Sequence, residues 1–317
     1  MDTRNERKRV LLLLSPLTYR AGAFLGAAER LDLDVAKGVD MPKRLADYWN
    51  QPLGFDFSRP EEATRAIVDL AAGAPFDAII SVDDSASLLA ASASAALGLP
   101  HNSPAAALAA RDKHVMREQL RAGGVPVPVF RPFLLSDEPR AIAAQVDYPC
   151  VVKPVLLSGS RGVIRADDPE EFVAAFARLR AMLLDEGVDP GRTTVLVEEF
   201  IPGVEVALEG LLTDGELRVL ALFDKPDPLD GPFFEETIYV TPSRLPDATQ
   251  EAIAEATVAA ARALGLRTGP VHAELRVNER GPWLVEIAGR SIGGRCSTIL
   301  EFGAGMTLEE LILRHAV

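Results

Sequence analysis

Two glutamates near the C-terminal end of the chain are spaced so that they could share a cation. Ala273 to Val277 alternates apolar and charged residues, a turn cluster with a glycine follows, and the next residues are again typical of a strand. Pairing Val277 with Trp283 puts Glu274 opposite Glu286 on one face of this hairpin, with Cβ atoms about 5 Å apart. Facing carboxylates repel each other unless a cation lies between them, and Mg²⁺ binds both carboxylate and phosphate oxygens. A surface hairpin with two solvated glutamates is the alternative interpretation.

Cations and small residues near these acids are suited to phosphate groups. Arg290 lies on a glycine-rich segment with Gly293 and Gly294, which offers a guanidinium and closely approaching backbone N–H groups. Lys153 lies inside an apolar strand, where a charge is costly without an anionic partner, so we expect it to face a ligand; an edge lysine is the alternative. The small-residue loop 158–163 could surround phosphates with N–H groups, although many hairpin turns look the same.

Two further segments have the character of ligand-binding elements. The apolar strand Thr194 to Val197 becomes acidic at Glu198, passes the turn Pro202-Gly203 and then resumes, which is the form of a hinge that presents backbone groups to a ligand. The loop 227–236 is polar, and it ends in two phenylalanines and two glutamates. It is either a substrate-closing loop or an ordinary excursion.

Composition limits the classes of partner. The chain has 317 residues and a formal net charge of −13, which argues against nucleic acid and against an anionic membrane surface as partners. Cys150 and Cys296 are too few for a disulfide framework and favour a reducing compartment. The apolar run Val10 to Leu14 is too short for a signal peptide, and no segment has the length of a membrane span. We therefore expect a cytoplasmic protein.

The first hundred residues predict a small doubly wound domain. Val10 to Leu14 has the pattern of a strand buried on both faces, and strands and helices then alternate up to Pro104. Asp83 and Asp84 follow the strand predicted at 78–82, at the edge where such sheets bind ligands. We prefer helix N-capping by Asp84 or Ser85 as their role.

Read together, these motifs resemble the ATP-grasp superfamily of carboxylate–amine ligases. The resemblance covers the chain from about Val10 and rests on Asp112-Lys113, Val152-Lys153-Pro154, the loop 158–163, Glu198-Glu199-Phe200-Ile201, Glu205, and Glu274 with Glu286. It implies a doubly wound α/β domain followed by an α+β ATP-grasp fold of two subdomains. The expected boundaries are 1–104 for the N-terminal domain, 105–198 for the small lid subdomain and 199–317 for the large subdomain with the metal site.

The resemblance also implies a role for each matched residue. Lys113 and Lys153 would neutralise ATP phosphates, Lys225 would lie near the γ-phosphate, and Arg290 would steady the acyl phosphate or its tetrahedral adduct. Glu205 would bind the ribose, and Glu274 and Glu286 would bind Mg²⁺, or Mn²⁺ in its place. The phosphate loop would comprise Ser158, Gly159, Ser160 and Gly162, and the adenine hinge Glu198, Glu199, Phe200 and Ile201; Gly293 and Gly294 would stabilise an oxyanion with Arg290.

The implied activity is ATP-dependent activation of a small carboxylate, of an amino acid in particular, for attack by an amine. The pattern from Glu286 to Gly294 is similar to the L-amino-acid ligase branch, but Ala288 stands where many members have a metal-binding asparagine, which would loosen one metal. Members of that branch run on past the position of Val317, so part of the pocket would be absent or supplied by a partner subunit. A homodimer fits the resemblance. The alternatives are a biotin-carboxylase-like or nucleotide-biosynthesis ATP-grasp enzyme, and an ATP-binding protein without turnover.

Overall fold

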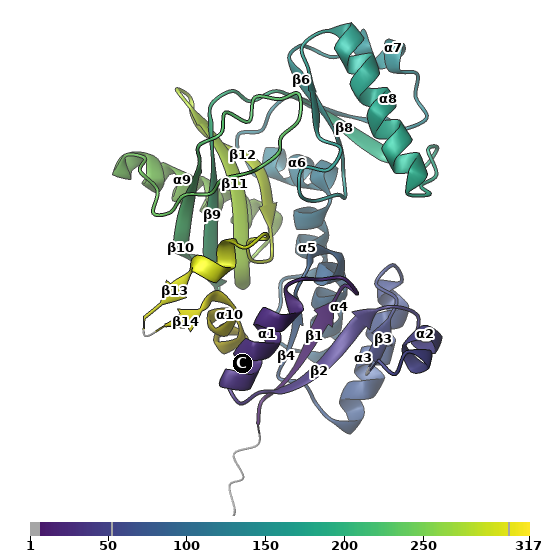
Figure 1. The fold of residues 1–317 in the computed structure, drawn as a ribbon, viewed down its shortest axis with the longest axis vertical. Coiled ribbons are helices and arrows are strands. Elements are labelled where there is room, and N and C mark those ends of the chain that lie inside the picture. The colour runs from purple at the N-terminus through teal and green to yellow at the C-terminus, as the bar shows by residue number, and fades with distance from the viewer. Residues whose placement is uncertain (1–6, 52, 304) are drawn as a thin grey trace, which may run out of the picture.

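The computed structural model describes residues 7–51, 53–303 and 305–317. Within these ranges the chain folds into three four-stranded sheets and a short two-stranded ribbon. We call the three sheets the N-terminal sheet, the lid sheet and the large sheet, in order of their first strands. Figure 1 shows the N-terminal sheet at the bottom, the lid sheet at the top right and the large sheet on the left, with helices between them.

The N-terminal sheet is parallel and is covered by helices on both faces. Its strands and helices are β1 (Arg9–Leu14), α1 (Ala21–Arg30), β2 (Asp34–Asp40), α2 (Lys43–Tyr48), β3 (Leu53–Phe55), α3 (Pro60–Gly73), β4 (Ala78–Ser81), the 3-10 turn η1 (Asp84–Ala86) and α4 (Ser87–Leu97). The strand order is β3-β2-β1-β4, with every pairing parallel. Leu11 and Leu13 pack with Ile67 of α3 and Leu89 of α4 on one face. An apolar run covered on both faces forms the central strand, as predicted.

The C-terminal helix α10 (Leu308–Ala316) covers the other face of the N-terminal sheet. Its Leu308 and Ile312 share a core with Val10 and Leu12 of β1 and with Phe24 of α1. Figure 1 shows α10 beside α1. The same core includes Ala207 and Phe223 of the large sheet, so α10 packs against both domains, and the predicted assignment of 199–317 to the large subdomain stays a prediction.

Two helices connect the N-terminal sheet to the rest. α5 (Pro104–Arg111) is capped by Ser103, and α6 (Lys113–Ala122) by Asp112, whose carboxylate accepts from the N–H groups of His114 and Val115 at 2.9 and 3.1 Å. Met116 and Leu120 of α6 lie in the core of the large sheet. The predicted lid boundary at 105 is therefore wrong for these helices, because the apolar stripe of α6 packs on the large sheet.

The lid sheet is antiparallel, in the order β5-β8-β6-β7. Its elements are β5 (Phe130–Leu134), α7 (Pro139–Ala143), β6 (Cys150–Pro154), β7 (Ile164–Ala166), α8 (Pro169–Asp185) and β8 (Thr194–Glu199). Phe172 and Phe176 of α8 are fully buried against Val152 and Val195. Strand β8 continues into the large sheet through the turn Pro202-Gly203, so the two sheets are joined at the predicted hinge.

The large sheet is also antiparallel, in the order β10-β9-β11-β12. Its elements and those that follow it are β9 (Val204–Thr213), β10 (Glu216–Lys225), α9 (Asp247–Leu264), β11 (Gly269–Asn278), β12 (Gly281–Ala288), the 3-10 turn η2 (Cys296–Ile299), β13 (Glu301–Phe302) and β14 (Met306–Thr307). Gly203, just before β9, has φ +127°, and a Cβ there would overlap the Val277 carbonyl oxygen. Glycine is therefore required where the hinge crosses β11.

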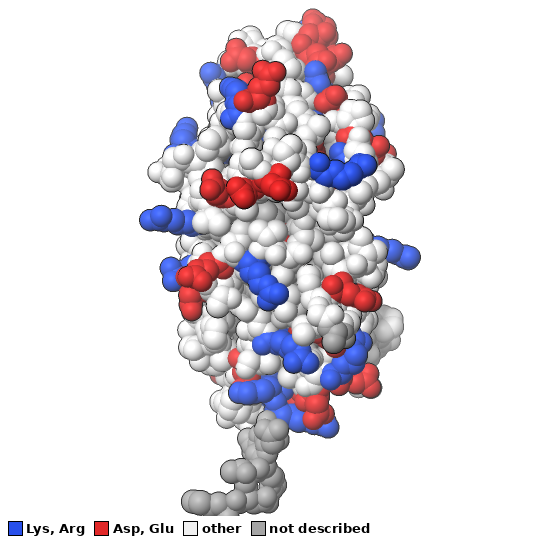
Figure 2. Space-filling view, turned by 90° about the vertical axis from the view of Figure 1, so that its left-hand side faces the viewer, with Lys and Arg blue, Asp and Glu red and all other residues white. Residues whose placement is uncertain are grey.

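The charges on the surface are mixed. Figure 2 shows lysines, arginines, aspartates and glutamates interspersed over one face of the molecule, without a continuous basic area on that face. Among the described residues, no helix combines the length and the apolarity that crossing a membrane would require.

Candidate active site between the lid and the large sheet

One cavity collects most of the predicted site residues. It lies between the lid sheet, the hinge and the large sheet, and the loop after β10 closes one side of it. The predicted residues that line it are Lys113, Lys153, Gly159, Ser160, Glu198, Glu199, Phe200, Ile201, Glu205, Glu274, Glu286 and Arg290. The two lysines therefore open onto the same space as the two facing glutamates.

Five predicted residues do not line this cavity. Gly162 lines a neighbouring cavity between the phosphate loop and the loop after β10, and Ser158 lines neither of the two. Lys225 lies beneath the cavity and contacts three acidic side chains. Gly293 and Gly294 follow β12 outside the lining, so the structure does not bring their N–H groups to the cavity with Arg290.

The hairpin β11–β12 brings the two glutamates together. Glu274 lies opposite Glu286, which confirms the predicted facing pair. The predicted pairing of Val277 with Trp283 is wrong by one residue, because Trp283 pairs with Arg276. A β-bulge at Val285 restores the register between the turn and the glutamates. The carbonyl oxygen of Val285, in the bulge, accepts a hydrogen bond of 2.7 Å from the Arg117 guanidinium.

Lys113 connects Glu286 to the lid. Its ammonium lies 3.2 Å from the Glu286 carboxylate and donates to the Leu157 carbonyl at 2.7 Å. Its backbone N–H donates to the Val155 carbonyl at 3.0 Å. The lysine side chain is buried, whereas 23% of the Glu286 side chain is exposed toward the cavity. A positive charge is thus fixed beside one of the two facing carboxylates.

Glu198 lies at the centre of a buried ion cluster. Arg117 donates to its carboxylate at 2.6 and 3.2 Å, and Lys153 lies 2.5 Å away. Burial opposes ionisation of Glu198, but Arg117 and Lys153 outweigh burial and lower the pKa of its carboxyl. Burial lowers the pKa of Lys153 to about 8, although Glu198 acts in the opposite direction. The predicted anionic partner of Lys153 thus includes a residue of the chain itself.

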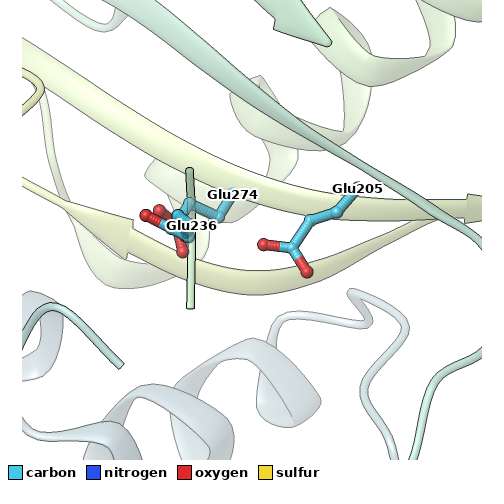
Figure 3. Close-up of side chains that lie close together, drawn as sticks. All are labelled: Glu205, Glu236 and Glu274. Carbon is cyan, nitrogen blue, oxygen red and sulfur yellow. The ribbon is translucent and has the colours of Figure 1, made fainter. Parts of the chain in front are cut away.

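Three carboxylates surround the ammonium of Lys225. Glu205 lies 2.8 Å from it and Glu274 3.2 Å from it, and Glu236 also contacts it. Figure 3 shows Glu205, Glu236 and Glu274 converging from two strands of the large sheet and the loop after β10. Burial opposes the charge on Lys225, but the three glutamates outweigh burial and raise the pKa of its ammonium. Lys225 is thus a buried counter-ion, and its predicted place near a γ-phosphate stays a prediction.

Oxygen ligands for a metal are present in the same place. Among the described residues, the carboxylates of Glu205, Glu236 and Glu274 lie within 4.8 Å of one another. Glu286 faces Glu274 but is not in this group. Lys225 already neutralises part of this group, whereas Glu274 and Glu286 offer the cavity carboxylate oxygens, the ligands that Mg²⁺ prefers, so the facing pair fits the predicted ion. Ala288 is buried opposite His272 and offers no metal ligand. Besides Glu286, the carboxylates near Glu274 are those of Glu205 and Glu236.

A second buried acid lies behind Glu274. His272 lies 3.4 Å from Glu274 on one side and 3.5 Å from Glu209 on the other. Glu209 is fully buried and accepts from the N–H of Ile292 at 2.8 Å. Burial opposes the charged imidazole, but the contacts to Glu209 and Glu274 raise the pKa of His272. Glu209 and His272 thus connect Glu274 to the segment that carries Arg290.

Arg290 is held by the N-terminal domain. Its guanidinium donates to Asp84 at 2.8 Å, and Arg20 donates to the Val82 carbonyl at 2.8 Å and also to the Ser291 hydroxyl. The prediction that Asp84 or Ser85 caps a helix is wrong, because neither η1 nor α4 has a side-chain cap. Asp84 instead forms an ion pair across the domain boundary.

Several site residues were not predicted from the sequence. They are Asp84, Arg117, Glu209, Glu236, His272 and Arg276. Each acts through a partner far away in the chain or on another strand. A local signal existed for one of them, because Glu236 ends a loop with more aromatic and acidic residues than a connector needs.

A parallel N-terminal sheet, a hinged lid and a cavity of lysines and paired glutamates between two antiparallel sheets define an ATP-grasp protein. Family models agree: the ATP-grasp N-terminal domain matches residues 26–101 and the ATP-grasp domain matches residues 146–299. The chain belongs to the ATP-grasp superfamily, and the predicted fold is confirmed.

Within this superfamily the chain is similar to amino acid ligases. It is 29% identical over 309 residues to the alanine–anticapsin ligase of Bacillus subtilis (strain 168), which covers 90% of this chain and 64% of the relative. It is 32% identical over 195 residues to the dapdiamide A synthase of Enterobacter agglomerans, which covers 61% of this chain and 45% of the relative. The crystal structure of an L-amino acid ligase from Bacillus licheniformis is similar with a TM-score of 0.77 and 28% identity, over 98% of this chain and 74% of that one.

The chain spans 64% of the length of the alanine–anticapsin ligases that it matches. What those relatives do as whole proteins is therefore brought to this chain as a proposal. The predicted resemblance to the amino acid ligase branch agrees with these relatives.

Proposed function

We propose that the protein is an ATP-dependent carboxylate–amine ligase that activates a small carboxylate, that of an amino acid, as an acyl phosphate. One observation carries the proposal: Glu274 and Glu286 face each other in the cavity that Lys113, Lys153 and Arg290 also line. This set can hold a triphosphate, a divalent cation and a second anion together. The named amino acid ligases among the relatives support the same class of reaction.

The hinge supplies a place for the adenine ring. The N–H groups of Glu199 and Phe200 donate to Val129 and Pro149, at 2.8 and 3.0 Å, and fix the hinge backbone to the lid sheet. Phe200 and Ile201 are buried beside the cavity and offer apolar contact. The Glu198 carboxylate is already bound by Arg117 and Lys153. Backbone groups of the hinge would therefore form the hydrogen bonds to the adenine ring.

The phosphates would lie between the two lysines and the facing glutamates. Mg²⁺, when bound by Glu274 and Glu286, would neutralise phosphate charge. Lys113 and Lys153 reach the cavity from α6 and the lid, so both would bind the same triphosphate. Screening by fixed cations is essential, because a carboxylate attacking a γ-phosphate brings two anions together.

Arg290 would act on the carbonyl side of the reaction. The Arg290 guanidinium lines the cavity and can bind the acyl phosphate. It can also stabilise the oxyanion that forms when an amine attacks the carbonyl carbon of the acyl phosphate. The C–N bond forms as the bond to phosphate breaks, and the products are ADP, inorganic phosphate and an amide. The lid and the loop after β10 flank the cavity and would exclude water, which otherwise hydrolyses the acyl phosphate.

Product analysis tests the proposal. The protein with ATP, Mg²⁺ and a panel of amino acids, singly and in pairs, should release ADP and phosphate in equal amounts to the amide formed. At a Mg²⁺ concentration that just saturates the wild type, the variant Glu286→Gln should lose most of its product formation, whereas Glu279→Gln, exposed at the hairpin turn, should keep it. Release of AMP and pyrophosphate would overturn the acyl-phosphate assignment.

The alternatives predict different results. A biotin-carboxylase-like or nucleotide-biosynthesis enzyme would release ADP only with bicarbonate or a nucleotide precursor, and a binding protein would bind ATP without turnover. The amino acid ligases among the relatives favour neither. Residence in the cytoplasm, which the two free cysteines favour, stays a prediction, as does a homodimer.

A further inference from the structure

The loop after β10 reaches the edge of the lid sheet. We call residues 226–238 the strap. Phe233 of the strap forms an antiparallel bridge with Ile164, and the Arg165 N–H donates to the Pro232 carbonyl at 2.9 Å. Both lid residues belong to β7, the edge strand of the lid sheet. Figure 1 shows the strap passing from the large sheet toward the lid. The strap therefore extends the lid sheet although it begins in the large sheet.

One side chain of the lid holds the strap. The Arg165 guanidinium donates to the Asp230 carbonyl at 2.7 Å and to Asp167 at 2.5 Å. It also lies over the Phe200 ring, 4.1 Å from the ring centroid. Arg165 thus contacts the strap, its own strand and the hinge at once. A planar guanidinium can make directed hydrogen bonds and stack on a ring together, which a lysine cannot.

The strap is held from the other side by the large sheet. Arg276 of β11 is buried and donates to the Pro228 carbonyl at 3.1 Å and to the Asp230 carboxylate at 3.3 Å. Its guanidinium also lies 4.9 Å from the centroid of the Phe200 ring. Arg276 thus ties the first half of the strap to the large sheet, and it meets the contact from Arg165 of the lid at Asp230. The second half, from Gly231 onward, is held at the lid edge by β7.

The far end of the strap enters the candidate active site. Glu236 contacts Lys225 and accepts from the Tyr239 hydroxyl, and it belongs to the carboxylate group with Glu205 and Glu274. A short chain segment separates Glu236 from Pro232, where the lid holds the strap. The position of the Glu236 carboxylate is therefore tied to the position of β7.

We propose that Arg165 is a positioning residue that fastens the strap to the lid and thereby keeps Glu236 at the Lys225 cluster. When the lid moves away from the large sheet, β7 takes the second half of the strap with it, and Glu236 leaves the cluster. Arg165 itself does not line the cavity. Its effect on turnover rests on the proposed function, but its effect on the strap does not.

Hydrogen exchange tests the fastening without any catalytic assay. The reporter is the backbone N–H of residue 165, which donates to the Pro232 carbonyl of the strap at 2.9 Å and is present in both the wild type and Arg165→Ala. In Arg165→Ala its exchange should become at least tenfold faster, because the strap detaches. The matched control is Arg192→Ala, which removes an exposed lid arginine that is 3.7 Å from Asp189 and far from the strap in sequence. Unchanged exchange in Arg165→Ala would overturn the proposal.

Kinetics test the consequence for the site. Arg165→Ala should lower kcat about tenfold and leave the Kd of a non-hydrolysable ATP analogue within about threefold of the wild type. Arg165→Lys, which can still donate one bond to Asp230, should recover part of kcat, and Arg192→Ala all of it. An equal loss of nucleotide affinity and kcat would instead assign Arg165 to the nucleotide pocket.

The two kinds of failure are distinguishable. If no amino acid supports turnover by the wild type, the proposed function fails and hydrogen exchange still decides the role of Arg165. If turnover is present and the strap exchanges at the wild-type rate in Arg165→Ala, only the strap proposal fails.

Discussion

The Asp84 carboxylate accepts a hydrogen bond of 2.8 Å from the Arg290 guanidinium across 206 positions of sequence. Asp84 follows the edge strand of the N-terminal sheet, and Arg290 follows β12 of the large sheet. Burial opposes the charge on Arg290, but Asp84 outweighs burial and raises the pKa of the guanidinium. Since an arginine is protonated at any physiological pH, this ion pair determines where the guanidinium lies.

Asp84→Asn should therefore slow the reaction without weakening nucleotide binding. The amide keeps the size of the side chain but loses its charge, so the guanidinium is less firmly placed. We expect kcat to fall about tenfold to hundredfold, with the Kd of ATP unchanged, in steady-state assays combined with calorimetry. Asp83→Asn is the matched control, because Asp83 accepts from Ser15 and Thr18 within its own domain. Equal losses in the two variants would show that Asp84 has no special role.

Arg117→Met should destabilise the fold. Arg117 is fully buried and makes two hydrogen bonds with Glu198, which would keep only Lys153 as a charged partner. We expect a loss of about 3 kcal/mol in the free energy of unfolding, measured by urea denaturation. Arg121→Met on the exposed side of the same helix should change it by less than about 0.5 kcal/mol. A similar small effect of both variants would contradict the structural role of Arg117.

Nucleotide affinity should fall in mildly alkaline solution. Burial lowers the pKa of Lys153 to about 8, so the lysine is charged below that pH and loses its proton above it. Phosphates bind the charged form, so the Kd of a magnesium–ATP analogue should rise by up to about tenfold per pH unit above 8. Lys153→Arg keeps its charge and should flatten this dependence. Calorimetry between pH 7 and 9.5 makes the comparison, and identical profiles for the two proteins would refute it.

Glu274→Gln and Glu286→Gln should each raise the concentration of Mg²⁺ needed for turnover. Each amide removes a negative charge from the facing pair, and an uncharged oxygen binds a hard cation less strongly. We expect half-saturation by Mg²⁺ to require at least about tenfold more metal, measured at constant free ATP. Glu199→Gln, on the hinge, should leave it unchanged. Unaltered metal dependence in both hairpin variants would place the metal elsewhere.

The sequence predicted the elements that depend on local patterns. The run Val10 to Leu14 reads as a buried parallel strand because charges and a Ser-Pro turn bound it. The facing of Glu274 and Glu286 was predicted from the alternation of side chains in two short strands. That prediction used a register one residue away from the real one, and the bulge at Val285 compensates for the difference.

What the sequence did not predict depends on which surfaces meet. A helix such as α6 shows an apolar stripe but not the sheet that covers it, so its packing on the large sheet could not be read from its residues. The same holds for Arg117, whose partner Glu198 lies on the lid. Asp84 lies just before a predicted helix, where an aspartate commonly caps the N-terminus. No neighbouring residue in the sequence indicates that it forms an ion pair with Arg290 instead.

Packing of α10 on β1 has a consequence for biosynthesis. The ribosome makes Val10 and Leu12 before Leu308 and Ile312, which cover them in the folded protein. This apolar face of the first domain therefore lacks its α10 cover until the chain has been synthesised as far as Ile312. Until then the nascent first domain exposes apolar surface that can aggregate.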